Sequence, residues 1–377
     1  QCSPNRSAIL TGCTPHTTST SRLHTPLPDW EPTFLEPLKS RGYFAGAFRK
    51  VHQGASFDKR WDFYGDAKEP FRAFFDRLPA GRPFFLHIGF TEPHRPYRRG
   101  AFSPPHDPAN VRVPNFLPDL PGVREDLAMY YDFIARLDQQ VGEVLSLLRA
   151  RHFENNTMVL FTGDNGMPFP RAKGTCYDPG IHVPLIVRFP GRVKPGAVHN
   201  ELISHVDFAP TFLDLAGLPK TAKMQGRSFL PLLTGGVYEA RDAVFSERNW
   251  HDNFDPIRAV RTRTHKLIFN AAPNFPYRPA WDIEDGLAWQ TIWQQRRRDL
   301  APHHRQMFMP TRPLLEMYDL VQDPGEFHNI ATDPAHSAVR ASLEKQLAAW
   351  MEATLDYLPP AAAAPGAPAG RNWPNAL

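Results

Sequence analysis

The sequence predicts an α/β protein with a mostly parallel central sheet flanked by helices and a smaller C-terminal α+β domain. Three observations support this prediction. Apolar segments of strand length alternate with helical patterns over about the first 234 residues, short strands then follow one another closely, and the chain has 377 residues. A chain of this length exceeds one small domain and fits one large domain with a smaller one.

The first part of the chain begins with a short helix and continues with alternating strands and helices. Ser3 suits the N-cap of that helix, Pro4 its first position and Gly12 its C-terminal stop. Residues 123–151 carry the longest amphipathic helical pattern. We expect further helices at residues 33–40 and 207–216. We expect strands at residues 43–48, 83–90, 157–162 and 183–189, of which 83–90 and 157–162 are buried. Ligands bind at the carboxyl ends of such strands, so the polar loops that follow them are candidate sites.

The second part of the chain has a different pattern. Short strands are expected at residues 243–247, 257–262, 266–270 and 315–320, with a helical stretch at 280–310 and a closing helix at 337–358. We therefore place a catalytic domain at residues 1–238 and a smaller α+β domain at residues 239–358. Residues 359–377 are rich in proline and alanine, and we expect them to form a disordered tail.

Composition excludes several classes of protein. The 43 lysines and arginines nearly balance the 39 aspartates and glutamates, and the triplet Arg296 to Arg298 is typical of a solvated helix face, so no nucleic-acid partner is expected. The longest apolar runs fall short of the roughly 18 residues of a membrane span. Three cysteines form no disulfide framework and leave at least one thiol for another purpose.

The first candidate site lies at the start of the chain. Cys2 and Arg6 stand at the beginning of a helix, where backbone N–H groups and the helix dipole favour an anion. The Arg6 guanidinium has forked donors that suit an oxyanion, and a cysteine in this setting is acidic and reactive. The alternative is an ordinary buried cysteine before a capped helix.

Other polar residues follow the predicted strands. Lys50 and His52 come after the strand at 43–48, and His94 follows the strand at 83–90. Asp164 and Asn165 follow the strand at 157–162, and their side-chain oxygens are hard ligands that suit Ca²⁺ or Mg²⁺. Asn-Gly is also a strong turn signal, and both interpretations of this segment can hold together.

The segment Cys2-Ser3-Pro4-Asn5-Arg6, followed by Leu10-Thr11-Gly12, resembles the signature of the sulfatase family, which has an alkaline-phosphatase-like fold. The resemblance implies that a separate formylglycine-generating enzyme oxidises Cys2 to formylglycine. The hydrated aldehyde would attack sulfur, and Arg6 would hold this diol. The expected activity is hydrolysis of sulfate from a sulfated saccharide.

Two further segments are similar to family motifs. Lys50-Val51-His52 looks like a glycine-lysine-x-histidine segment, although Arg49 stands where the glycine is usual. The resemblance implies that Lys50 binds a sulfate oxygen and the nucleophile, and that His52 is the base. Pro93-His94 resembles a loop whose histidine contacts sulfate and protonates the leaving group. Lys173, in a run similar to lysine-glycine-threonine-x-tyrosine, would neutralise the sulfate.

The resemblance also implies a metal site. Asp164 and Asn165 would bind one divalent ion, Ca²⁺ with Mg²⁺ as the alternative, together with two aspartates on a strand before the cysteine motif. Since the chain begins at Gln1 with that motif, we expect a preceding segment that holds those aspartates and a signal peptide. The chain as given is therefore expected to be inactive, and the protein to be secreted, periplasmic or lysosomal.

Several segments look like the heparan N-sulfatase (sulfamidase) branch of the family. They are residues 164–170, 113–119, 137–142, 317–320, 323–324 and 329–334. In that branch the second domain helps to form the sugar pocket. Our candidates there are Glu247 and His251 for sugar hydroxyls and Trp250 for stacking on the ring, with interdomain packing as the alternative for all three.

Three other functions remain open at this point. An O-sulfatase would share the nucleophile and metal, so only the sugar pocket distinguishes it from an N-sulfatase. A non-catalytic protein that binds sulfated glycans is disfavoured by the complete set of Cys2, Arg6, Lys50, His52 and His94. A phosphatase or phosphonate hydrolase of the same superfamily is disfavoured by a cysteine at the nucleophile position. The sequence leaves the oligomeric state undecided.

Overall fold

The computed structural model describes residues 1–298 and 300–357, so the expected tail at 359–377 lies outside the described residues. A parallel sheet of three strands forms the centre of the N-terminal part. Strand β1 (Phe44–Arg49) lies between β2 (Phe63–Gly65) and β3 (Phe84–Gly89) and pairs in parallel with both. This arrangement confirms the expected fold class.

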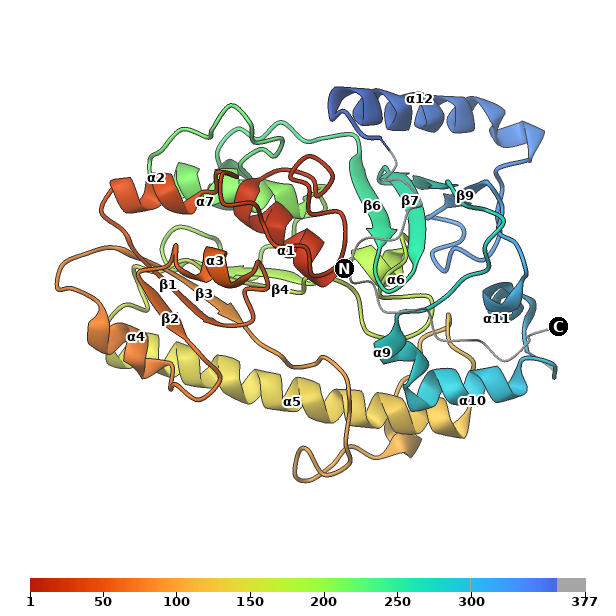
Figure 1. The fold of residues 1–377 in the computed structure, drawn as a ribbon, viewed down its shortest axis with the longest axis horizontal. Helices are drawn as coiled ribbons and strands as arrows, with labels where there is room; N and C mark the ends of the chain where they lie inside the picture. Colours follow the sequence, from red (N-terminus) through yellow and green to blue (C-terminus); the bar gives the residue numbers. More distant parts are fainter. Residues whose placement is uncertain (299, 358–377) are drawn as a thin grey trace.

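Helices cover both faces of this sheet (Figure 1). Helices α1 (Cys2–Thr11), α2 (Leu35–Ser40) and α7 (Phe208–Leu215) pack on one face, where Leu10, Leu35 and Leu213 share a core with residues of β1. Helices α4 (Arg72–Arg77) and α5 (Pro121–Ala150) pack on the other face, around a cluster of phenylalanines. The two layers bury the apolar sides of the strands, as an α/β sheet requires.

Strands β4 (Val159–Thr162) and β5 (Leu185–Arg188) form a separate antiparallel pair. Within the described residues, β3 pairs only with β1 and β4 pairs only with β5, so each has one unpaired edge. A cavity of about 1430 Å³ is lined by β3 and β4, and most residues of these two strands are only half-buried. The expectation that the strands at residues 83–90 and 157–162 are buried is therefore wrong, because residues of both line this cavity and are mostly half-buried.

A four-stranded antiparallel sheet organises the C-terminal part. Its order is β6 (Val244–Trp250), β7 (Phe254–Arg261), β8 (His265–Asn270) and β9 (Leu315–Asp319), and helix α12 (Ser337–Ala353) packs on it. Helix α10 (Leu287–Gln295) instead packs against α5 of the first part. The remaining short helices are α3 (Ala55–Asp58), α6 (Asp178–Ile181), α8 (Leu230–Thr234), α9 (Trp281–Glu284) and α11 (Pro302–Arg305).

Two expectations about element ends are corrected. Helix α1 begins at Cys2, because the Asn5 N–H already donates to the Gln1 carbonyl, so Ser3 lies inside the first turn and is not the N-cap. The Ser3 hydroxyl instead accepts from the His24 N–H at 2.8 Å. Helix α12 ends at Ala353 rather than near residue 358. No helix among the described residues is long and apolar enough to cross a membrane.

A buried ion pair fixes the chain after α12. The Arg258 guanidinium on β7 donates to both carboxylate oxygens of Asp356, and neither side chain is exposed. Breaking a buried pair leaves an uncompensated charge, which is strongly destabilising. We expect Asp356→Ala to lower the free energy of unfolding by about 3–5 kcal/mol in urea titrations.

Glu344→Ala is the matched control for this prediction. Glu344 pairs with Arg340 one turn away on α12, and both side chains are about 40% exposed. Its removal should cost no more than about 0.5 kcal/mol. Equal effects of the two substitutions would show that the buried pair does not hold the C-terminal part together.

Candidate active site

Cys2 is the first residue of α1 and lines the cavity between β3 and β4. Its side chain is only 4% exposed. The Sγ atom lies 3.6 Å from Asn165 Oδ1 and 3.5 Å from Lys50 Nζ. Burial and the charge of Asp164 raise the thiol pKa, but the contact with His94 and two lysines lower it more, and the net pKa is about 7. The thiol is therefore acidic, as a helix start among cations predicts.

Arg6 lies one turn further along α1 and joins the helix to two strand ends. Its Nε donates to Asp164 Oδ2 at 2.6 Å, and its Nη1 donates to the Lys50 carbonyl. Burial alone would raise the pKa of Asp164, but Arg6 and Lys50 outweigh it and hold that pKa well below its usual range. The Asp164 carboxyl group is therefore ionised at neutral pH.

The loop after β1 carries Lys50 and His52 in an unusual backbone conformation. Arg49 and His52 have φ of 60° and 67°, in the left-handed region that favours glycine. The glycine that is usual at position 49 in the family would adopt this φ without strain, so Arg49 occupies a glycine-like conformation. Gly89 on β3 is also required, because a Cβ there would lie 2.0 Å from the Lys50 carbonyl oxygen.

His52 is neutral in this environment. Burial, then Lys50 and His24, lower the pKa of its imidazole to about 3. Its Nε2 lies 2.7 Å from Nδ1 of His24, so one of the two rings donates a hydrogen bond to the other. An uncharged imidazole is the form that accepts a proton, as the expected role of base requires.

His94 and Lys173 approach the thiol from two other loops. Lys173 is 2% exposed, and its Nζ donates to Asp282 Oδ2 at 2.6 Å. His94 Nε2 lies 3.8 Å from the same oxygen. Both residues influence the pKa of Cys2, so they face the same centre as Lys50 and Arg6. Five of the six expected catalytic residues, all but His52, therefore line one cavity at the carboxyl ends of β1, β3 and β4. The charges of Lys50 and Arg6 also act on His52.

Asp164 and Asn165 follow β4 at this point and fit a hard divalent cation. The Asn165 carbonyl oxygen faces the Cys2 sulfur, and the Asp164 carboxylate lies beside Arg6. Carboxylate and carboxamide oxygens are the ligands that Ca²⁺ and Mg²⁺ prefer. The two side chains would offer two oxygen ligands beside Cys2, and their assignment to a metal stays a prediction.

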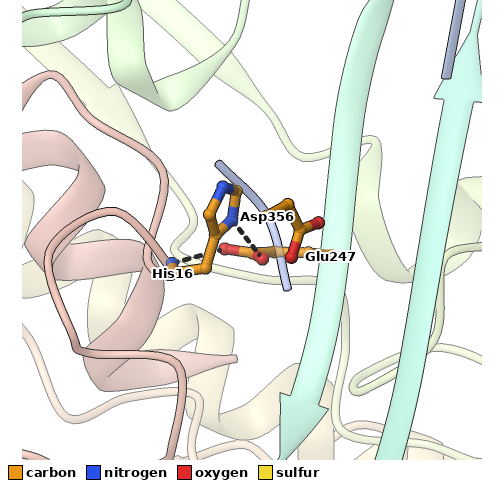
Figure 2. A group of neighbouring side chains, drawn as sticks. All are labelled: His16, Glu247 and Asp356. Atoms are coloured by element: carbon orange, nitrogen blue, oxygen red, sulfur yellow. Dashed lines mark hydrogen bonds and ion pairs between the residues drawn. The ribbon is translucent and has the colours of Figure 1, made fainter. Parts of the chain in front are cut away.

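The three expected sugar-binding residues have separate environments. Glu247 accepts from His16 Nδ1 at 2.7 Å, and the two side chains form a buried cluster with Asp356 (Figure 2). Arg258 lies near both carboxylates of this cluster, so their charge is already compensated. This geometry favours the interdomain-packing alternative for Glu247.

Trp250 and His251 lie nearer to the site. The Trp250 ring packs on Phe254 and under the Arg22 guanidinium, and its backbone carbonyl accepts from Leu23. His251 Nδ1 hydrogen-bonds Asp252 at 2.7 Å, and its Nε2 is buried without a hydrogen-bond partner among the described residues. The charges of His251 and Lys173 act on one carboxylate, Asp282, so His251 faces the same polar centre.

Two site residues carry no motif in the sequence. Asp282 lies on α9 inside a stretch that was expected only to be helical, and it reaches Lys173 across 109 residues. His24 follows Leu23 in a loop, and its contact with His52 spans 28 residues. No periodicity or spacing marks either residue, because each is brought to the site by the tertiary fold.

The parallel sheet with helices on both faces, and the cations and side-chain oxygens around an acidic cysteine, agree with the class that the sequence motifs predict, a hydrolase of alkaline-phosphatase-like fold that acts on an anionic group. Residues 62–218 match the family model described as sulfatase, and residues 171–278 match that of the N-sulphoglucosamine sulphohydrolase C-terminal region. The chain belongs to the sulfatase family, and the protein is a sulfuric ester or sulfamide hydrolase.

Similar proteins extend over most of the chain. The N-sulphoglucosamine sulphohydrolase of Homo sapiens is 30% identical over 94% of this chain and 81% of its own length. An ulvan-active sulfatase of Formosa agariphila is 27% identical over 94% of this chain and 67% of its own length. A protein solved in complex with its substrate D-glucosamine-2-N,6-O-disulfate has a TM-score of 0.68 at 16% identity, covers 94% of this chain and 88% of that chain, and supports the fold.

The acidity of Cys2 can be measured in protein produced without the maturation enzyme. Alkylation by iodoacetamide should follow a titration with a midpoint near pH 7, because only the thiolate reacts. Lys50→Met should move this midpoint to higher pH, since a nearby cation that stabilises the thiolate is lost. Peptide mass spectrometry gives the extent of labelling at each pH.

Cys2→Ser is the control for selectivity. Burial raises the pKa of Cys13, and that of Cys176 to about 11, so neither should be labelled near pH 7. A Cys2 midpoint near pH 9 would contradict the electrostatic description of the site.

Proposed function

We propose that the protein removes sulfate from N-sulfoglucosamine in heparan-type glycans. The observation that carries this proposal is the likeness to the human N-sulphoglucosamine sulphohydrolase over 94% of the chain. The matched C-terminal region, residues 171–278, contains Lys173 and strands β6 to β8. The proposal thus draws on the part of the chain in which a sugar pocket is expected as well as on the nucleophile.

The nucleophile derives from Cys2 in this proposal. Members of the family generally carry formylglycine at this position, and here a formylglycine-generating enzyme would convert Cys2. A hydroxyl of the hydrated aldehyde attacks sulfur while neutral His52 accepts its proton. Lys50 lies within reach of the hydroxyls, since its Nζ is 3.5 Å from the Cys2 sulfur, and Arg6 lines the same cavity.

Departure of the sugar requires a proton. As the new S–O bond forms, the S–N bond breaks and its electron pair goes to the nitrogen. His94 donates a proton to that nitrogen, so the sugar leaves as a neutral amine and the sulfate stays as an ester on the hydroxyl that attacked. Once His52 has passed its first proton to solvent, it would take the proton of the second hydroxyl. The aldehyde would then re-form as its C–O bond to sulfate breaks, which releases sulfate, and water would hydrate the aldehyde again. Lys173 neutralises charge on the sulfate, and these preset cations stabilise the negative charge that accumulates in the transition state.

Asp164 and Asn165 would hold one divalent ion, for which we propose Ca²⁺ with Mg²⁺ as the alternative. The ion would add positive charge next to the nucleophile and the sulfate. His251 is the residue that we propose for contact with the sugar, because its Nε2 is buried near Lys173 without a partner among the described residues. We also propose that Trp250 stacks on the sugar ring. Glu247 is the remaining proposed sugar contact, although His16 already binds its carboxylate.

A second candidate function is hydrolysis of an O-sulfate on another glycan or a small sulfate ester. The likeness to an ulvan-active sulfatase supports it, at 27% identity over 94% of the chain. The nucleophile and cations would act in the same way on either bond. For both substrates we propose a secreted, periplasmic or lysosomal location.

Removal of the metal should abolish activity. Incubation of the matured enzyme with EDTA, followed by desalting, should reduce sulfate release to background, because the carboxylate at position 164 would lose its ion. Added Ca²⁺ should restore turnover, and Asp164→Ala should be inactive with or without it. Activity that survives complete chelation, verified by elemental analysis, would contradict the assignment of Asp164 and Asn165.

The substrate is tested with glucosamine carrying both an N-sulfate and a 6-O-sulfate. The protein is expressed from its complete gene together with the maturation enzyme, and free amine and inorganic sulfate are measured in parallel. We expect one amine for each sulfate, because the S–N bond is the one that breaks. The Cys2→Ala variant, which should fold but release nothing, is the control; sulfate without amine would establish the O-sulfatase instead.

A further inference from the structure

The carboxylate of Asp282 lies between two cationic residues of the site that no local motif connects to it. Its Oδ2 is 2.6 Å from Lys173 Nζ and 3.8 Å from His94 Nε2. Its Oδ1 is buried and has no hydrogen-bond partner among the described residues. A partly buried carboxylate is costly unless neighbouring groups compensate its charge, and Lys173 is the cation that does so here.

Helix α9 is held in place independently of these contacts. The Trp281 N–H donates to Asp252 Oδ2 at 2.8 Å, and the same oxygen accepts from His251. Ile283, the next residue of α9, is fully buried in the core shared with α5 and α10. The position of Asp282 is thus set by the packing of its helix, and Lys173 and His94 come to it from other loops.

The hydrogen bonds of His94 define which nitrogen can donate a proton. Its Nδ1 lies 2.6 Å from the Arg95 carbonyl oxygen, which can only accept, so Nδ1 carries a hydrogen. A proton for the leaving group must therefore be on Nε2, which makes the ring an imidazolium. Nε2 is the nitrogen that faces Asp282.

The charges around His94 come from three other elements. Cys2 of α1 contacts it, Asp282 of α9 faces it, and Lys173 lies on the far side of Asp282. Lys173 disfavours a second cation nearby, and His251 faces Asp282 from the turn between β6 and β7. Burial raises the pKa of Asp282, but Lys173 and then His94 lower it further, so the group stays ionised. Asp282 is the anion that offsets the repulsion between Lys173 and a protonated His94.

We propose that Asp282 is a positioning residue that holds the Lys173 ammonium in place and fixes the His94 ring so that its Nε2 can donate to the leaving nitrogen. The inference rests on the proposed function, since it assigns a partner to the acid of that reaction. When the S–N bond breaks, the proton passes from His94 Nε2 to the nitrogen, and His94 becomes neutral. Asp282 keeps its charge throughout, and a proton from solvent returns to His94 before the next turnover.

The test is a double-mutant cycle with N-sulfoglucosamine as substrate. Asp282→Asn keeps the shape of the side chain and removes its charge, and it should lower kcat about 100-fold, within the range of a lost general acid. His94→Ala should lower kcat at least as much. The double variant should lose less than the product of the two single losses, because part of the effect of Asp282 passes through His94 and the rest through Lys173. Full additivity of the two losses would overturn the proposal.

Rescue by the conservative variant gives a second readout that a merely structural role would not change. Asp282→Glu restores the charge, and it should recover much of the kcat that Asp282→Asn loses. An Asp282→Glu variant that folds normally and is as slow as Asp282→Asn would also overturn the proposal.

Failure of the proposed function gives a different result from failure of this inference. A matured wild-type enzyme that releases no amine from N-sulfoglucosamine refutes the function itself. A wild-type enzyme that does release amine, with Asp282→Asn as active as the wild type or additive with His94→Ala, leaves the function intact and refutes the role of Asp282. Thermal unfolding of each variant shows whether the loss comes from the fold.

Discussion

The ion pair between Arg6 and Asp164 is the interaction on which the site depends. It joins the first helix to the end of β4 across 158 residues, at 2.6 Å. The same guanidinium donates to the Lys50 carbonyl after β1, which packs directly on Gly89 of β3. One buried side chain thereby brings the carboxyl ends of three strands to the start of one helix. The cysteine lies at that helix start, so its chemistry follows from how these segments are joined.

The site balances a large positive charge with few carboxylates. Arg6, Lys50 and Lys173 converge on the cysteine. Asp164 pairs with Arg6, and Asp282 pairs with Lys173. Such preset cations stabilise the negative charge that develops between them. Lys50 has the cysteine sulfur as its contact, which leaves it available to an oxyanion. Asp164, in contrast, lies beside Arg6, which lowers the pKa of its carboxyl group. The carboxylate therefore stays ionised, and an ionised carboxylate is the form that binds a divalent metal ion.

The sequence predicted the parts of the site that are local in the chain. The helix behind Cys2, the loops after the strands and the turn at Asp164 and Asn165 each have a short pattern with a physical cause. The loops after β1 and β3 meet because these strands are parallel neighbours, whereas β4 belongs to a separate antiparallel pair and ends near them. Asp282 and His24 could not be predicted, because tertiary packing alone brings them to Lys173 and His52. The Ser3 cap failed because a hydroxyl can serve either its own helix or a neighbouring loop, here at His24.

The C-terminal part of the chain takes part in the active site as well as in the fold. Its sheet is joined to the first part through His16 and Glu247, and the chain after α12 is fixed to β7 by Arg258 and Asp356. Asp282 comes from the same region and must stay within hydrogen-bond distance of Lys173. A displacement of Asp282 by about 1 Å is enough to lose this contact, and sites on rigid elements hold such positions more precisely than sites on loops. The buried ion pairs far from the cysteine therefore preserve the geometry that the chemistry requires.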